Sequence, residues 1–391
     1  MTLFGEQQAS VEVDTSSIWS GLFKGLQRNV KNPSQQYQAL AWSTDGVNVE
    51  KYEGNPVINA PNYQPNIRDP KVWKHGDRYY MVLGNSFNND TLGRVLIYSS
   101  LDGIAWEEES ILGESEGPLG YMWECPDFFE LDGYFVLLFS PQGLKPEGDK
   151  YRNLYQTGYI VGHFDYTTHC FKHLTEFVEL DRGHDFYATQ TLWDEEKNRR
   201  IVIAWMDTWE QNYPERNDGW TGQMTIPRVL SLTEDLRLIQ KPVKEIWAAR
   251  CRTLYSGEAQ GGHTVQLENK AAEIKITASK DQNLNLFIES TNASVCISYD
   301  SKEHKVSLDR GGEDGMRRTD WKPTDKIEWY ILVDASSIEL FCGDGEVTFS
   351  SRYFPYDEVT VRVGDHAKVD NMSVTSMKRT VEKPYDDDDD E

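Results

Sequence analysis

Apolar and polar residues alternate along much of the chain with a period of two, which is the pattern of half-buried β-strands. The alternation is cleanest in the C-terminal part, in segments 272–278, 283–289, 294–299, 328–333 and 337–341. The N-terminal part carries shorter apolar and aromatic runs that end at turn residues, in segments 78–83, 94–98, 134–139 and 200–205. Long stretches with the 3.6-residue period of a helix are missing. The pattern therefore predicts an all-β fold with few helices.

The change in pattern along the chain predicts two domains. We expect an aromatic-rich domain over residues 1–240, a linker over 241–250, a β-sandwich over 251–381 and an acidic tail over 382–391. Strand clusters of about 45 residues, the length of a propeller blade, would fill the first domain with about five blades. Two stacked sandwiches or jelly rolls would fit as well. The pattern alone therefore leaves the N-terminal architecture open.

Charge and hydropathy exclude several classes of protein. The chain of 391 residues has 64 Asp and Glu against 40 Lys and Arg, so its formal net charge is −24. This charge repels phosphate backbones, and we expect no nucleic-acid partner. No run of 18 apolar residues occurs, and the first thirty residues lack a charged start followed by an apolar block. We therefore expect no membrane span and no secretory signal.

The cysteines indicate reduced thiols. Their number is odd and no two have Cys-x-x-Cys spacing; they are Cys125, Cys170, Cys251, Cys296 and Cys342. A disulfide framework or a zinc site is therefore not expected, and the simplest interpretation is a cytoplasmic protein. The eight histidines form no His-x-x-x-His pair. We predict no metal and no cofactor.

Two short blocks place carboxylates in unusual surroundings. In the first, Arg68 stands beside Asp69 and is followed by Pro70, which would pin a carboxylate at the start of a strand. A surface turn is the ordinary alternative for such a tripeptide. In the second, Glu124 lies among Met, Trp, Cys and Phe side chains. A Glu in such apolar surroundings is suited to general acid catalysis, whereas on an edge strand it would simply point to solvent.

A third block combines aromatic residues that suit a sugar ring. Tyr187 lies in the run His184-Asp185-Phe186-Tyr187-Ala188-Thr189-Gln190, and Trp205, Trp209 and Trp220 follow it. These side chains could form an aromatic wall around a ligand. The alternative is that they pack between sheets, which must hold for several of the 12 Trp.

Taken together, the blocks resemble the family 32 glycoside hydrolases, the β-fructofuranosidases. Arg68-Asp69-Pro70-Lys71-Val72, Trp123-Glu124-Cys125-Pro126-Asp127 and the 184–190 run occur in the family's order and rough spacing. The segment 333–341 resembles the family's sandwich signature, and the likeness extends over about residues 37–375. The resemblance implies a five-bladed β-propeller followed by a C-terminal β-sandwich.

The resemblance also assigns roles. The family hydrolyses fructosyl bonds with retention, using two carboxyl groups about 5 Å apart. Glu124 matches the acid/base, and Asp69 matches the carboxylate that holds the sugar hydroxyls and stabilises the transition state. Arg68 would orient Asp69, and Cys125 matches the neighbour of the acid.

The substrate implied by the resemblance is a small fructoside, either sucrose, sucrose 6-phosphate or a fructan. Tyr187, Trp205 and Trp220 are the expected walls of the fructosyl site. Lys145, Lys150 and Arg152 lie in a segment resembling the phosphate-acting branch, although ordinary surface positions would also explain them. An oligomer is compatible with the sequence.

One part of the family pattern is missing. The family nucleophile is the Asp of an Asn-Asp-Pro-Asn block, and no Asn-Asp-Pro occurs in this chain. The text Leu3-Phe4-Gly5-Glu6 matches the family's aromatic-Ser-Gly block poorly. We therefore expect the chain to begin late in the catalytic domain, as if truncated, with an incomplete first blade and little or no hydrolysis.

Three functions follow from this departure. The first is a retaining β-fructofuranosidase acting on sucrose or sucrose 6-phosphate. The second is a non-catalytic fructoside-binding protein that keeps Arg68, Asp69 and the aromatic wall. The third is an inactive truncated remnant whose open strand edges would favour aggregation. Sucrose turnover, sucrose binding without turnover, and poor solubility would distinguish them.

Overall fold

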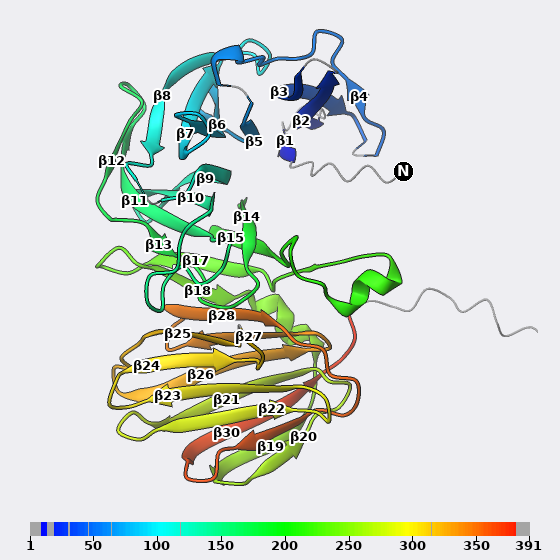
Figure 1. The fold of residues 1–391 in the computed structure, drawn as a ribbon, viewed down its shortest axis with the longest axis vertical. Coiled ribbons are helices and arrows are strands. Elements are labelled where there is room, and N and C mark those ends of the chain that lie inside the picture. The colour runs from blue at the N-terminus through cyan, green and yellow to red at the C-terminus, as the bar shows by residue number, and fades with distance from the viewer. Residues whose placement is uncertain are drawn as a thin grey trace, which may run out of the picture. The chain divides into compact units, whose positions relative to one another are not determined.

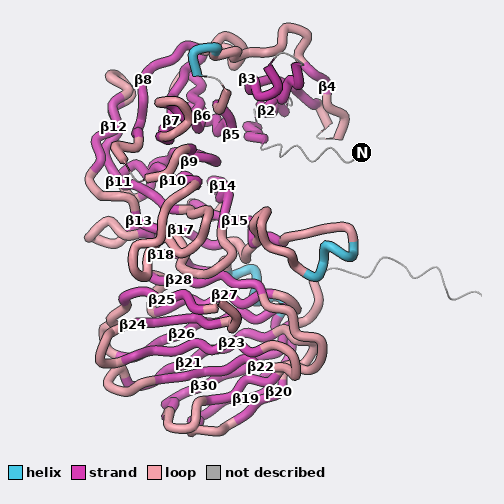
Figure 2. Tube along the Cα trace, in the orientation of Figure 1, coloured by secondary structure: helices cyan, strands magenta, loops and turns pink. Residues whose placement is uncertain are grey.

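The computed structural model describes residues 9–13, 19–29, 32–45, 47–63, 65–117, 119–313 and 315–380, with side chains from residue 36 onward. The predicted acidic tail and the Leu3–Glu6 text lie outside these residues. Strands dominate the described part of the chain, and its helices are three short 3₁₀ segments (Figures 1 and 2). These are η1 (Pro61–Tyr63), η2 (Pro214–Asp218) and η3 (Lys244–Ala249). None of the helices described is long and apolar enough to cross a membrane.

The contacts divide the chain into two compact units. The first comprises Met1–Leu180, Tyr187–Trp193 and Glu234–Leu236, and the second comprises the remaining segments. The predicted boundary near residue 240 therefore differs from the division by contacts. Residues 194–233, expected in the N-terminal domain, belong to the same unit as the C-terminal sheets.

The first unit contains three antiparallel sheets in sequence order. The first sheet has β1 (Ala9–Val13), β2 (Trp19–Asn29), β3 (Asn32–Ser43) and β4 (Glu50–Lys51). The second has β5 (Ile67–His75), β6 (Arg78–Phe87), β7 (Leu92–Ser100) and β8 (Glu107–Glu114). The third has β9 (Met122–Leu131), β10 (Tyr134–Gln142), β11 (Gly158–Asp165), β12 (Cys170–His173) and β13 (Val178–Glu179).

The first strand of each sheet packs against the sheet before it. β5 contacts β1, β2 and β3, and β9 contacts β5, β6 and β7. Apolar side chains fill the spaces between sheets, with an aliphatic cluster around Leu40, Ile67 and Leu83 and an aromatic cluster around Trp123 and Phe139. Because Trp123 is only 1% exposed, packing between sheets explains this Trp. Consecutive sheets joined in this way are the arrangement of propeller blades.

A fourth sheet follows in the order β14–β15–β17–β18, with β16 paired to β15. Its strands are β14 (Tyr187–Asp194), β15 (Arg199–Met206), β16 (Gln223–Met224), β17 (Arg228–Leu232) and β18 (Leu238–Pro242). The residues of β14 up to Trp193 belong to the first unit, and β15 to β18 belong to the second. The described residues thus form four blade-like sheets, where the resemblance implies five blades.

The C-terminal part is a sandwich of two six-stranded sheets (Figure 1). One has the order β19–β30–β21–β26–β27–β28, with bounds Arg250–Gln260, Lys368–Met377, Ala272–Ser279, Lys326–Asp334, Ser337–Cys342 and Val347–Arg352. The other has the order β20–β29–β22–β23–β24–β25, with bounds Thr264–Gln266, Thr360–Val363, Leu284–Glu289, Ser294–Asp300, Lys305–Asp309 and Met316–Asp320. Alternate residues of each strand are buried in one large apolar cluster between the sheets. The strands predicted from two-residue alternation are all confirmed.

Candidate active site

The first strands of the second and third sheets share an unusual backbone feature. Asp69 in β5 has a φ of 62° and Cys125 in β9 has a φ of 51°, both in the left-handed region. At each position two residues oppose one on the neighbouring strand, so each is a β-bulge. Pro70 and Pro126 follow directly, where no backbone N–H is needed for pairing. Bulges of this kind redirect side chains, and here they present Asp69 and the region of Glu124 at the same end of adjacent strands.

Glu124 is buried and receives four hydrogen-bond contacts on its carboxylate. The Arg68 guanidinium approaches Oε1, with Nε at 2.7 Å and Nη2 at 2.6 Å. Oε2 accepts from Gln142 Nε2 at 2.7 Å and from the Tyr187 hydroxyl at 2.6 Å. The four donors come from three different strands, β5, β10 and β14. They fix both the position and the orientation of a carboxyl group that would otherwise be costly to bury.

Asp69 lies beside Glu124 and shares its arginine. Its Oδ2 accepts a hydrogen bond from the backbone N–H of Cys125 at 3.1 Å, and the Cys125 Sγ lies 3.9 Å from the same oxygen. Arg68 Nε is 4.0 Å from Asp69 Oδ2. Arg68 was expected to orient Asp69, and its shorter contacts are with Glu124. The arginine thus bridges two buried carboxyl groups.

Burial and charge set the protonation of the two groups that hold Glu124. Burial alone would lower the pKa of Arg68, but the charges of Glu124 and Asp69 outweigh it and raise that pKa above its usual value. Burial, followed by the charge of Glu124, raises the pKa of Tyr187 well above the ordinary phenol value. Arg68 therefore stays a cation and Tyr187 keeps its proton at neutral pH.

A second ion pair, whose two residues were not predicted to meet, joins the strands of the site. The Lys71 ammonium lies 3.2 Å from Asp127 Oδ2, and it also donates to the carbonyl of Thr191 at 2.6 Å. Asp127 Oδ2 in turn accepts from the Thr191 N–H and hydroxyl, each at 2.8 Å. These contacts join β5, β9 and β14 a few residues along the strands from Glu124. They fix the spacing between the strands that carry Asp69, Glu124 and Tyr187.

The supporting residues around Arg68 were also missed. Gln36 Oε1 accepts from the Ile67 N–H at 3.1 Å and from Arg68 Nη1 at 3.4 Å. Asn66 Oδ1 accepts from the same Nη1 at 2.9 Å. Asn66 lies two residues before Arg68, in the block that the sequence singled out, but its contact was not predicted. Gln36 stands in no such block, because it acts through pairing with a distant segment.

Trp205 and Trp220 belong to the second compact unit. Trp205 in β15 is half-buried, with its ring centroid 5.4 Å from that of Trp209. Trp220 follows η2 and is 53% exposed. Their predicted place in the wall of a fructosyl site stays a prediction, whereas Tyr187 lies directly against Glu124.

A cavity of about 440 Å³ opens near the carboxylates. Its lining residues are Asp90, Thr91, Gly117, Gly120, Tyr121, Gly143 and Lys145. Tyr121 and Gly143 are next in sequence to the Met122–Glu124 segment and to Gln142, respectively. Asp90 accepts a hydrogen bond from Asn66 at 3.0 Å, and Asn66 contacts Arg68. The cavity is therefore two hydrogen bonds away from the guanidinium that holds Glu124.

Paired buried carboxyl groups beside an open cavity are typical of the glycoside hydrolases. The Glycosyl hydrolases family 32 N-terminal domain matches residues 9–242, and the family's C-terminal domain matches residues 243–377. The chain belongs to glycosyl hydrolase family 32. The predicted family resemblance is thereby confirmed.

Individual relatives point the same way. The chain is 37% identical over 333 residues to a sucrose-6-phosphate hydrolase of Staphylococcus xylosus, a match that covers 81% of this chain and 66% of that protein. It is 35% identical over 328 residues to a raffinose invertase of Escherichia coli, covering 82% of this chain and 68% of the relative. The chain spans about two thirds of the length of these curated relatives.

Among solved structures, the β-fructofuranosidase BmSUC1 of Bombyx mori has a TM-score of 0.89 and 39% identity. The match covers 96% of this chain and 80% of that one. A variant of the same enzyme in complex with sucrose has a TM-score of 0.87 and 40% identity, covering 95% of this chain and 79% of that one. These matches confirm the predicted propeller followed by a β-sandwich.

Proposed function

We propose that this chain carries a fructoside site of the retaining β-fructofuranosidase type, with Glu124 as acid/base and Asp69 as the carboxylate that holds the fructosyl ring. The observation that carries the proposal is the confinement of Glu124 between Arg68, Gln142 and Tyr187. A general acid must be held within hydrogen-bond reach of the glycosidic oxygen, and a carboxyl group fixed from both sides meets this need.

The hydrogen bonds also allow Glu124 to change its protonation state. When Glu124 is ionised, the Tyr187 hydroxyl donates to Oε2 at 2.6 Å. When Glu124 carries a proton on Oε2, this O–H can donate a hydrogen bond to the Tyr187 oxygen. The Tyr187 O–H can then turn toward the Ser140 carbonyl, which lies 3.4 Å away. The proton then passes to the leaving glucosyl oxygen as the fructosyl C2–O bond breaks, and C2 forms its new bond to a carboxylate nucleophile or, without one, directly to water, which gives up a proton. Asp69 stabilises the positive charge that develops on the fructosyl ring.

The missing Asn-Asp-Pro block defines a second candidate function. A retaining reaction needs a carboxylate nucleophile to form the glycosyl-enzyme, and this sequence lacks the block that the family resemblance associates with it. The chain would then bind fructosides and turn them over slowly. Loss of a covalent nucleophile commonly lowers the rate by several orders of magnitude.

Adding azide, an external nucleophile, distinguishes the two candidate functions. We expect calorimetry to detect sucrose binding, and we expect slow sucrose hydrolysis that azide accelerates by forming a C–N bond at fructosyl C2. Glu124→Gln should abolish the azide-dependent reaction while leaving the fold intact. Rapid sucrose hydrolysis without azide would show that the chain has a functional nucleophile. Absence of binding, hydrolysis and rescue together would contradict the proposed site.

We further propose that the glucosyl part of the substrate occupies the cavity beside Tyr121. Tyr121 is 41% exposed and offers a ring face, Asp90 and Thr91 offer hydrogen-bonding oxygens, and Lys145 is the cation among the lining residues. Lys145 would contact a phosphate on this sugar. These features support either sucrose or sucrose 6-phosphate as the substrate, and we propose that Lys145 distinguishes between them.

Comparing the two sugars tests this assignment. Lys145→Gln should weaken the binding of sucrose 6-phosphate about fivefold, as expected for the loss of one exposed charge contact, and leave sucrose binding unchanged. Lys150→Gln changes an exposed lysine of the same segment that does not line the cavity, and it serves as the control. An equal effect of Lys145→Gln on both sugars would assign it no role in phosphate recognition.

A further inference from the structure

A groove of about 990 Å³ lies in the β-sandwich, in the second compact unit. It runs between β19 and β20, which are the edge strands of the two different sheets. The hairpin at Gly261 and Gly262 carries the chain from one sheet to the other, and the sheets diverge below it. Its apolar lining residues include Leu254, Val265 and Leu267. The groove is thus an opening at the edge of the sandwich.

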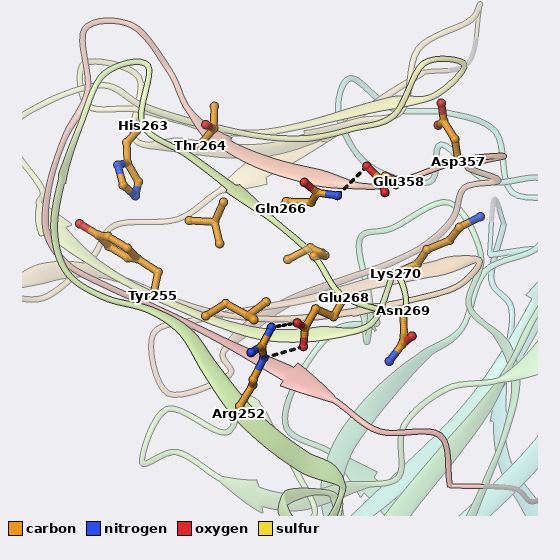
Figure 3. A pocket seen from close by; sticks show the side chains of 13 residues that line it. Arg252, Tyr255, His263, Thr264, Gln266, Glu268, Asn269, Lys270, Asp357 and Glu358 are labelled. Atoms are coloured by element: carbon orange, nitrogen blue, oxygen red, sulfur yellow. Dashed lines mark hydrogen bonds and ion pairs between the residues drawn. The ribbon is translucent and has the colours of Figure 1, made fainter.

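Polar side chains around the groove are held in place by one another. Arg252 pairs with Glu268, with Nε 3.0 Å from Oε2, and Gln266 donates to Glu358 at 2.5 Å (Figure 3). Lys270 donates to the Pro355 carbonyl at 2.9 Å. These side chains therefore form an ordered polar rim before any ligand binds, which lowers the entropy cost of recognition.

An aromatic pair closes one end of the groove. The rings of Tyr255 and His263 lie with centroids 4.2 Å apart and an interplanar angle of 48°. The Tyr255 hydroxyl donates to the Glu258 carbonyl, which fixes the ring. His263 Nε2 is shielded from solvent and has no hydrogen-bond partner among the described residues. The ring of Tyr255 is therefore the part of this pair that can contact a ligand in the groove.

The charges around the groove select the class of ligand. Two cations, Arg252 and Lys270, face three carboxylates, Glu268, Glu358 and Asp357. The formal sum is −1, so an anionic ligand gains nothing from the groove as a whole. A purely apolar ligand would leave the polar rim unsatisfied. A sugar chain matches both features, because its C–H faces pack on aromatic and aliphatic surfaces while its hydroxyls reach planar polar side chains.

We propose that this groove is an accessory binding site for neutral oligosaccharides, separate from the carboxylates of the first unit. Tyr255 provides the ring on which a sugar stacks, and Gln266 and Asn269 provide hydrogen bonds to hydroxyls. The groove volume lies at the upper end of the range for ligand sites and accommodates more than one sugar ring. The proposal does not depend on hydrolysis at Glu124.

Calorimetric titration of the full chain with two trisaccharides, kestose and maltotriose, tests the proposal. We expect Tyr255→Ala to weaken binding at one site about tenfold, the loss of one stacking partner, and Gln266→Ala to weaken the same site. Gln266 is exposed, so its substitution should leave the fold unchanged. Tyr134→Ala, which removes another tyrosine paired with a histidine, His163, is the matched control and should leave binding unchanged.

Arg68→Ala distinguishes the two sites. If the groove binds oligosaccharides, some binding survives Arg68→Ala, and adding Tyr255→Ala or Gln266→Ala to this variant weakens it. If Arg68→Ala removes all binding, or if both groove variants bind as the wild type does, the groove is not a sugar site. If binding were absent only at the Glu124 site, the proposed function would be contradicted, whereas the groove assignment would not.

Discussion

The carboxyl group of Glu124 depends on residues that are far away in sequence. Arg68, Gln142 and Tyr187 each donate to it, and each lies 18 to 63 residues from Glu124 along the chain. The three donors differ chemically, since Arg68 carries a charge, Gln142 is neutral and Tyr187 can also accept a hydrogen bond. Tyr187 is therefore the partner best able to follow a change in the protonation of Glu124.

Removal of the Tyr187 hydroxyl should affect turnover and leave ligand binding intact. We expect Tyr187→Phe to lower the azide-dependent reaction of sucrose about tenfold, because Glu124 loses the hydroxyl that hydrogen-bonds both its ionised and its protonated form. The affinity for sucrose should change little, since the ring remains. Chromatography of the fructosyl products measures the rate. Tyr166→Phe, which removes a hydroxyl that accepts from Trp73, is the control; an equal loss there would mean a general effect on packing.

At the scale of the strand, close packing between sheets limits what the site can tolerate. Gly84 in β6 lies against β9, and a Cβ at this position would come within 2.0 Å of the Trp123 carbonyl oxygen. That oxygen belongs to the backbone directly before Glu124 and cannot turn away. The absence of a side chain at Gly84 is therefore part of how β9 is positioned.

Gly84→Ala should both destabilise the first unit and disturb its site. We expect the unfolding free energy to fall by roughly 1–3 kcal/mol, the usual cost of overpacking, and sucrose binding to weaken. Urea denaturation and calorimetry measure the two effects. Gly117→Ala adds the same methyl group where nothing lies within 4 Å, so its stability should be unchanged. Equal stabilities of the two variants would contradict the proposed contact.

A buried carboxylate in the sandwich predicts how stability depends on pH. Glu273 in β21 accepts from Arg250 Nε at 2.6 Å and from Lys275 Nζ at 2.9 Å. Burial opposes its charge, but the hydrogen bonds from Arg250 and Lys275 outweigh burial and hold the pKa of Glu273 below 4.5. A depressed pKa means that the stabilisation is present above pH 4.5 and is lost as the pH falls through the folded-state pKa.

Substituting Glu273 should therefore flatten the acid side of the stability profile. We expect the melting temperature of Glu273→Gln to fall less steeply below pH 4.5 than that of the wild type. At neutral pH the variant should be less stable, because Arg250 loses its ionic partner. Thermal melts across this range test the prediction. Glu328→Gln, on an exposed position of β26 in the same sheet, should keep the wild-type slope.

Whether a strand or a site contact could be predicted from the sequence depends on how far apart along the chain the interacting residues lie. The two-residue alternation of β21, β22, β23, β26 and β27 reports local burial, and the sequence predicted those strands correctly. Glu124 and Asp69 stood out as carboxylates in unusual surroundings, but only the family resemblance joined them in one site. Gln142, Gln36 and the Lys71–Asp127 pair were missed, because their roles arise from pairing between strands and leave no periodic signal.

At the scale of the molecule, a buried ionic network crosses the predicted boundary at residue 240. Arg228 in β17 is fully buried and contacts Asp181 at 3.0 Å and Glu339 of β27 at 2.7 Å. Asp181 also accepts from the N–H and hydroxyl of Ser350 in β28, each at 2.8 Å. These contacts join the segment before β14, the fourth sheet and the sandwich in one unit, which alternation along the chain does not reveal.

The same network predicts that β15–β18 and the sandwich unfold together. Burial alone would lower the pKa of Arg228, but Glu339 and Asp181 raise it, so Arg228 remains a cation between two carboxylates. Arg228→Met would keep an unbranched apolar stem and leave both carboxylates buried without their cationic partner. We expect the unfolding free energy of the second unit to fall by roughly 3–5 kcal/mol.

Two spectroscopic signals can follow this loss. Fluorescence of the tryptophans reports on both parts of the second unit, which contains Trp205 in β15 and Trp329 in β26, and far-ultraviolet circular dichroism reports on the sheets. Both transitions should move together to lower urea concentration in Arg228→Met, while Arg237→Met, on an exposed turn, should not move them. If the single-tryptophan variants that retain only Trp205 or only Trp329 unfolded at different urea concentrations, β15–β18 would be an independent element. A common midpoint is expected, because a buried charge left without its partners destabilises every strand that surrounds it.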